Sequence, residues 1–210
     1  MTTPLAQYLN DVAPLRPRAG IWRILLGLAF AVTGQIVATV VIFATYAAVT
    51  TLTTDMGFGE ALDRAGALRT PGSLIAVLLT FIGPILGVWL AMRWLHKTGT
   101  GILMGHSGQL DIALFNRAAA IFLILGVAAF LVTLPLQGLE RNLPMSRWLI
   151  WVVPALVVTF VQVFAEELLF RGYLQSQLAA RFRSPLIFVG IPTLIFGAAH
   201  GSNAAAFGAN

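Results

Sequence analysis

Long apolar segments separated by short polar ones are the main pattern along the chain. A helix needs about 20 apolar residues to cross a hydrocarbon core of about 30 Å. Four segments reach about that length, at residues 24–49, 74–95, 118–136 and 148–170, and a fifth at 185–200 is shorter but almost wholly apolar. The pattern predicts an all-α fold, a polytopic transmembrane helical bundle with about five spans in this chain.

Two features of the segments and their connections refine this prediction. Residues 50–73 mix acidic and basic side chains with glycines, and we expect a short interfacial helix in this connector. Pro84 and Pro154 lie inside predicted spans and should bend them, because proline removes a backbone donor and clashes with the preceding turn.

Composition narrows the class of protein. Hydrophobic residues make up 58% of the chain and charged residues 10%, and the mean hydropathy is +0.86. Soluble domains contain about 25% charged residues, so an ordinary soluble domain is excluded. The net charge of +5 comes from basic residues in loops beside apolar segments, and we expect no nucleic-acid partner. The chain has no cysteine, which excludes disulfides, cysteine-ligated metals and a thiol nucleophile.

The basic residues also predict an orientation in the membrane. Eight lie in the connections on one side, Arg16, Arg18, Arg23, Arg93, Lys97, Arg117, Arg181 and Arg183, and four lie on the other, Arg64, Arg69, Arg141 and Arg147. The positive-inside rule then favours a cytoplasmic N-terminus. The first 20 residues lack the pattern of a cleaved signal peptide, so the first span would act as an uncleaved signal. We expect an integral, multi-pass protein of a bacterial or archaeal plasma membrane.

Charged side chains interrupt the end of the fourth apolar segment. An isolated charge at the bilayer centre costs roughly 3 kcal/mol, so such residues indicate function. Helical spacing places Glu167 and Arg171 on one face, four residues apart, while Glu166 is rotated by about 100°. One carboxylate therefore has a partner and the other is free for chemistry. A purely structural network of both acids with Arg171 is the alternative.

The position of His200 favours the chemical interpretation. Ser184 as a helix N-cap and Pro185 at the first helical position indicate a turn at Arg183. Glu166 lies 17 residues before Arg183 and His200 lies 17 residues after it. Two antiparallel helices joined there place both side chains about 25 Å from the turn. A Glu and a His at one level can hold a water whose proton the Glu accepts. A structural role for His200 is the alternative.

Other polar residues carry less information. Gln35 and Gln162 are expected to donate interhelical hydrogen bonds, and Gln162 could also line the site. Asn203 and Asn210 could donate to an oxyanion, or could be loop residues facing solvent.

The remaining histidines are expected to be ordinary surface residues. His96 and His106 share a loop with Lys97 and are ten residues apart, which is not a metal-ligand spacing.

Two motifs resemble those of a known family. The motif EExxxRGYL beginning at Glu166 and the motif FxxxH ending at His200 are similar to the first two motifs of the CAAX protease and bacteriocin-processing (Abi) family. These proteins are intramembrane endopeptidases and include the type II CAAX proteases of prenylated proteins. The resemblance covers roughly residues 153–201. It implies that Glu166 activates water, that His200 orients this water, that Glu167 and Arg171 support them, and that Phe196 packs the site.

The resemblance implies hydrolysis of peptide bonds within or beside the membrane. The expected partners are membrane lipids and a peptide or lipidated-protein substrate, such as a prenylated CAAX-type tail or a bacteriocin. We expect a single membrane domain over residues 1–210, with a cytoplasmic N-terminal segment at 1–23 and the catalytic motif helices at 148–210. Family members usually continue to a third motif with a His and an Asn that stabilise the oxyanion. This chain stops before one, and we expect a truncated, inactive product.

The cofactor expectation follows from the number of available ligands. The family has been described both as metal-dependent and as glutamate-dependent. Catalytic zinc takes three protein ligands. Glu166, Glu167 and one His do not form a convincing zinc set, so we expect no certain cofactor.

Two other functions remain open. One is a non-catalytic immunity or scaffold protein, which would tolerate Glu166→Gln. The other is a proton-coupled transporter with the carboxylates as a relay. Transporters often have inverted repeats and acids spread over several helices, whereas these acids are adjacent and the chain shows no repeat.

Overall fold

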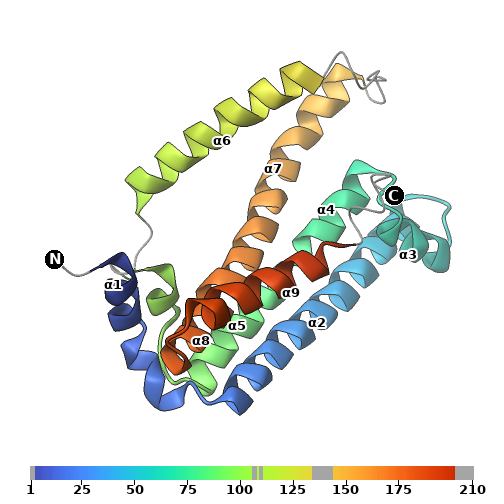
Figure 1. Ribbon diagram of the computed structural model, residues 1–210. Coiled ribbons are helices and arrows are strands. Elements are labelled where there is room, and N and C mark those ends of the chain that lie inside the picture. Colours follow the sequence, from blue (N-terminus) through green and yellow to red (C-terminus); the bar gives the residue numbers. More distant parts are fainter. Residues whose placement is uncertain (1–2, 106–107, 109–110, 134–143, 202–210) are drawn as a thin grey trace.

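The structure, a computed structural model, describes residues 3–105, 108, 111–133 and 144–201, and this part of the chain is helical without strands. Four of its helices are long and apolar enough to cross a membrane, Ile21–Thr53, Pro71–Trp94, Ile112–Thr133 and Met145–Arg181, and Leu186–Ala199 is a shorter apolar helix. The predicted all-α transmembrane bundle is confirmed (Figure 1).

The elements follow one another with short connections. In chain order they are α1 (Pro4–Asp11), η1 (Ala13–Arg18), α2 (Ile21–Thr53), α3 (Phe58–Gly66), α4 (Pro71–Leu79), α5 (Ile82–Trp94), η2 (Thr100–Met104), α6 (Ile112–Thr133), α7 (Met145–Glu167), η3 (Leu168–Leu174), α8 (Gln175–Arg181), η4 (Leu186–Gly190) and α9 (Ile191–Ala199). Two of the short elements, η1 and η2, are 3₁₀ helices, and the other two, η3 and η4, are π-helices. The first connector contains the expected short helix, α3.

The second span is divided into α4 and α5 by Pro84. This proline has no N–H to donate to the carbonyl of Thr80, four residues earlier. The N–H of Gly83 donates to that carbonyl instead, at 3.0 Å. The side chain of Gln35 in α2 donates from Nε2 to the Thr80 hydroxyl at 2.8 Å, which confirms its predicted interhelical bond. Pro154, in contrast, lies inside α7, which continues through it.

Glycines allow α2 and α5 to pack with their backbones in contact. A Cβ added at Gly34 would overlap the carbonyl of Gly83, and one added at Gly83 would overlap the carbonyl of Gly34. One turn further along, a Cβ at Gly87 would overlap the backbone of Phe30 and Ala31. Small residues at such contacts are typical of membrane helix pairs, because close approach supplies the van der Waals energy that the hydrophobic effect does not supply in lipid.

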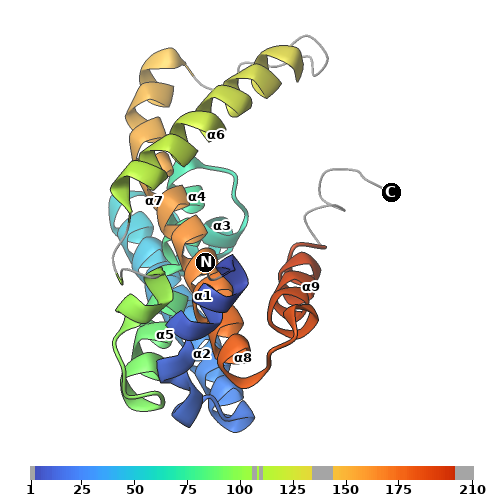
Figure 2. The same cartoon turned by 60° about the vertical axis from the view of Figure 1, so that its left-hand side comes forward.

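The N-terminal segment packs on the end of the longest helix. Val12 and Leu15 lie in one buried cluster with Leu178 and Ala179 of α8 and Phe188 of η4. The element of this segment that contacts α8 is η1, and Figure 2 shows the segment at the end of the molecule where α8 lies. The last turns of the Met145–Arg181 helix are therefore covered by protein.

A buried polar cluster joins the start of α2 and the residues after α5 to η3, and it contradicts the expected surface position of His96. The ring of His96 is 2% exposed, and its Nε2 lies 3.0 Å from the hydroxyl of Tyr173. That hydroxyl donates to the carbonyls of Arg23 and Ile24 at 3.3 and 3.4 Å, and it occupies the space where Gly27 has no side chain. Burial lowers the pKa of His96 from its usual value of 6.5, because the charged ring would lose its hydration. His106 lies outside the described residues.

Helix α6 stands apart from the other helices (Figure 1). Its side chains are exposed along the whole helix except for Thr133, which is partly exposed. One ring pair joins it to the bundle, between Phe115 and Phe160 of α7, with ring centroids 6.1 Å apart.

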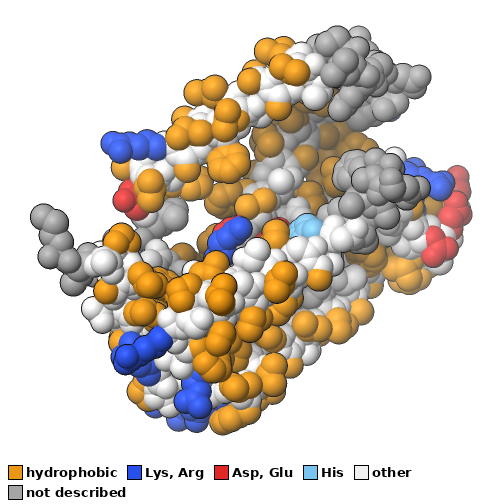
Figure 3. Space-filling model, in the orientation of Figure 1, with side chains coloured by type: hydrophobic (Ala, Val, Ile, Leu, Met, Phe, Trp, Pro, Cys, Tyr) orange, Lys and Arg blue, Asp and Glu red, His pale blue; other side chains and the backbone are white. Residues whose placement is uncertain are grey.

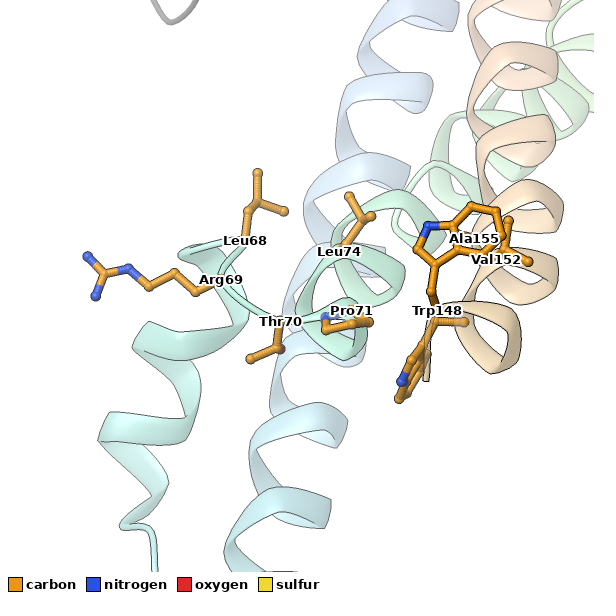
Figure 4. Close-up of a pocket in the computed structure, with 9 residues that line it drawn as sticks. Leu68, Arg69, Thr70, Pro71, Leu74, Trp148, Val152 and Ala155 are labelled. Atoms are coloured by element: carbon orange, nitrogen blue, oxygen red, sulfur yellow. The ribbon is translucent and has the colours of Figure 1, made fainter. Parts of the chain in front are cut away.

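A cavity of about 410 Å³ lies at the far end of the bundle, between the start of α4 and α7. Its walls include Leu74 of α4 and Trp148 and Trp151 of α7, while the side chain of Arg69 points away from α7 (Figure 4). None of the predicted site residues lines this cavity.

Candidate active site

The acidic pair lies where α7 changes into a π-helix. Glu166 and Glu167 are the last two residues of α7, and Arg171 lies in η3. A π-helical turn inside a longer α-helix is uncommon and is frequent at functional sites. Arg171 Nη1 forms an ion pair with Glu167 Oε1, as their four-residue spacing predicts.

Glu166 and His200 lie together, as their equal distances from the turn predict. His200 caps the C-terminus of α9, and its Nε2 is 3.7 Å from Glu166 Oε1. The side chain of Glu166 is 17% exposed and that of His200 is 35% exposed. Gln162, one turn earlier in α7, donates from Nε2 to the same Glu166 oxygen at 3.2 Å. This bond lies within α7, so the expected interhelical hydrogen bond of Gln162 is wrong, and Gln162 contacts the site through Glu166 instead.

The hydrogen bond of His200 Nδ1 determines which tautomer the neutral ring adopts, and therefore whether Nε2, the nitrogen that faces Glu166, is an acceptor. Nδ1 lies 2.9 Å from the carbonyl oxygen of Phe196. A carbonyl only accepts hydrogen bonds, so Nδ1 carries the hydrogen and Nε2 of the neutral ring is an acceptor. Two acceptors 3.7 Å apart do not bond directly. A water placed about 2.8 Å from each could donate one hydrogen to Glu166 and the other to His200.

Aromatic rings surround the histidine. The ring of Phe196 lies 4.3 Å from that of His200 and 5.2 Å from that of Phe170, measured between centroids. The guanidinium of Arg171 lies over the same Phe196 ring, 5.7 Å from its centroid. Phe196 therefore packs the site, as the resemblance implies. Figure 3 shows a basic side chain, an acidic area and a histidine near one another in the hollow that α6, α7 and α9 surround.

The described residues do not assemble a zinc site. Within residues 3–105, 108, 111–133 and 144–201, no group of three or more His, Cys, Asp or Glu side chains is close enough to hold a metal ion. Glu166 and His200 are two ligands, and Glu167 contacts Arg171 instead. Asn203 and Asn210, which could donate to an oxyanion or be loop residues facing solvent, lie outside the described residues.

A comparison with protein-family models supports the resemblance carried by the two motifs. Residues 147–209 match the family model of the type II CAAX prenyl endopeptidase, Rce1-like, and this range contains Glu166, Glu167, Arg171 and His200. Comparisons with curated proteins and with solved structures give no match. The C-terminal part of the chain is thus an Rce1-like domain, which confirms the resemblance to the CAAX protease and bacteriocin-processing family of membrane endopeptidases.

Proposed function

We propose that this protein is an intramembrane endopeptidase that cleaves the C-terminal tails of prenylated or otherwise membrane-associated peptides. The observation that carries the proposal is the 3.7 Å approach of His200 Nε2 to Glu166 Oε1, from two different helices. The Rce1-like domain supports the same class of reaction.

The proposed reaction begins with the water between Glu166 and His200. With both hydrogens donated to these two acceptors, the water oxygen directs a lone pair toward the substrate carbonyl carbon. As the C–O bond forms, Glu166 accepts one proton from the water. When the C–N bond breaks, this proton passes to the departing amine nitrogen, so Glu166 returns to its starting state.

The pair of Glu167 and Arg171 supports this arrangement without taking part in the proton transfer. Their ion pair keeps a carboxylate and a guanidinium from being unpaired in a membrane-spanning segment, where either alone is costly. Glu167 is the residue after Glu166 and Arg171 lies in η3, so their ion pair also holds the end of α7 against the first turn of η3.

His200→Ala tests the proposed role of His200 as an acceptor for the water. We expect this change to lower the rate of peptide hydrolysis by about 10²–10⁴-fold, because the water loses one of its two acceptors. The measurement is release of product from a fluorescent farnesylated peptide in lipid vesicles, by a purified version of the protein that continues to a third motif with its His and Asn. His106→Ala, at a histidine that the sequence places in a loop, is the control and should retain activity. Unchanged hydrolysis by His200→Ala would contradict the proposed role.

We also propose that the N-terminus is cytoplasmic. The chain has no cysteine of its own, so single cysteines report their side of the membrane directly. Arg16→Cys and Arg183→Cys should be protected from a membrane-impermeant maleimide in intact cells, and Asp63→Cys in α3 should react. The opposite labelling pattern would show that the orientation is inverted.

A further inference from the structure

We propose that a small pocket beside the candidate active site binds the C-terminal carboxylate of the peptide tail, with Arg171 as the residue that determines this specificity. The inference rests on the proposed function, because it assigns a substrate group to a pocket next to the same site. It adds a second role to Arg171, which so far is the partner of Glu167.

The pocket lies between η3 and α9 and has a volume of about 80 Å³. A cavity needs roughly 10–15 Å³ of such volume to hold one water, so the space suits several waters or one small group such as a carboxylate. Arg171, Gln175 and Thr193 are polar residues in its wall, and Phe170 and Phe196 supply aromatic rings.

The polar wall offers hydrogen-bond donors that the described residues leave unused. A guanidinium has five N–H donors, and Arg171 uses its Nη1 for Glu167 and lies with its face over Phe196. Gln175 makes no side-chain hydrogen bond within the described part of the chain. The hydroxyl of Thr193 already donates to the carbonyl of Val189 at 2.8 Å. Unused N–H groups on one wall favour a ligand that only accepts, which is the property of a carboxylate.

Charge favours the same ligand. The side chain of Arg171 is 61% exposed and lies in the span Met145–Arg181, where an incompletely paired cation is costly. A carboxylate at the end of a peptide is equally costly to bring into this environment without a cation. The planar guanidinium can hold a carboxylate with two parallel hydrogen bonds, and its separate edges allow it to contact Glu167 at the same time.

The pocket is at a suitable distance from the water site. Arg171 follows Glu166 by five residues, which is about 7.5 Å along a helix. An extended peptide advances about 3.3 Å per residue. A carboxylate at Arg171 would then place a peptide bond two or three residues before the chain end near Glu166 and His200. The Phe196 ring, which contacts both His200 and Arg171, forms the wall between the two positions.

The experiment compares two peptides that differ at one group. A fluorescent farnesylated peptide with a free C-terminal carboxylate and the same peptide with a C-terminal carboxamide are titrated against purified Glu166→Gln protein, which removes turnover from the measurement. We expect the acid to bind at least about 10-fold more tightly than the amide, as for a charge-assisted hydrogen bond. Equal affinities would overturn the inference, and this comparison needs no change in the pocket.

Substitutions of Arg171 then test whether the preference for the acid over the amide arises in this pocket. Adding Arg171→Gln should reduce the ratio of the two affinities to about one, and Arg171→Lys should give an intermediate ratio, because it keeps the charge but loses the two parallel donors. Arg183→Gln, at the turn of the same helical hairpin, is the matched control and should keep the full preference. A preference that survives Arg171→Gln would overturn the assignment.

The outcome for this pocket is separable from the outcome for the proposed function. Preference for the acid without any hydrolysis by a version of the protein that continues to a third motif would support the pocket and contradict the peptidase. Hydrolysis of both peptides at the same rate and with the same affinity would support the peptidase and contradict the pocket. If neither peptide binds, both proposals fail.

Discussion

Glu166→Gln is expected to lower the rate of peptide hydrolysis by about 10²–10⁴-fold without unfolding the protein. The change keeps the shape of the side chain, and its amide oxygen can still accept the hydrogen bond from Gln162, but it can no longer take a proton from the water. The measurement is cleavage of a fluorescent farnesylated peptide in lipid vesicles by a version of the protein that continues to a third motif, together with the helical content and the unfolding transition of the purified variant.

Glu167→Gln is the matched control on the neighbouring residue. We expect a smaller loss of activity and a larger loss of stability, because Arg171 would lose its ionic partner in a membrane-spanning segment. If both variants hydrolysed the peptide at nearly the original rate, neither carboxylate would be the base. A scaffold or immunity protein would then explain the two adjacent carboxylates better than a peptidase.

The second large effect is expected at the contact between α2 and α5. Gly83→Ala should lower the free energy of unfolding by about 3 kcal/mol, because the added methyl group overlaps the carbonyl of Gly34 and forces two helix backbones apart. The overlap is with backbone atoms, which cannot move away as the end of a flexible side chain could. The measurement is a denaturation curve in mixed micelles, followed by circular dichroism.

Gly126→Ala in α6 provides the control for this prediction. A Cβ at Gly126 meets no atom within 4 Å, so the same chemical change there adds no contact. It should leave stability unchanged or raise it by about 0.5–1 kcal/mol, since alanine is the better helix former. Equal effects of the two changes would mean that the α2–α5 contact is not close in the folded protein.

The parts of the structure that the sequence predicts are those that depend on length and helical spacing. The number of spans follows from the length of each apolar segment. The approach of Glu166 and His200 follows from their equal separation from Arg183, because every helical residue advances by about the same distance. The contact of Glu167 with Arg171 follows from their four-residue spacing.

Features that depend on tertiary contacts were not predictable in this way. One histidine in a polar loop carries no signal that it is buried, and His96 is buried because Tyr173 and the start of α2 enclose it. The helix of the fourth span ends at Arg181 instead of near residue 170, and the N-terminal segment packs on Leu178 and Ala179 of this extension. The π-helical turns also lack a local sequence signal here.

The packing of the N-terminal segment on α8 has a consequence for biosynthesis. Val12 and Leu15 are made at the start of translation, but their partners Leu178 and Ala179 are made near the end. The Tyr173 hydroxyl likewise donates to the Arg23 carbonyl across 150 residues of sequence. Until the ribosome has passed this region, the apolar residues of the N-terminal segment lack their final contacts and can associate with other proteins or with the membrane surface. This end of the protein therefore cannot complete its folding until α8 has been made, although its synthesis begins there.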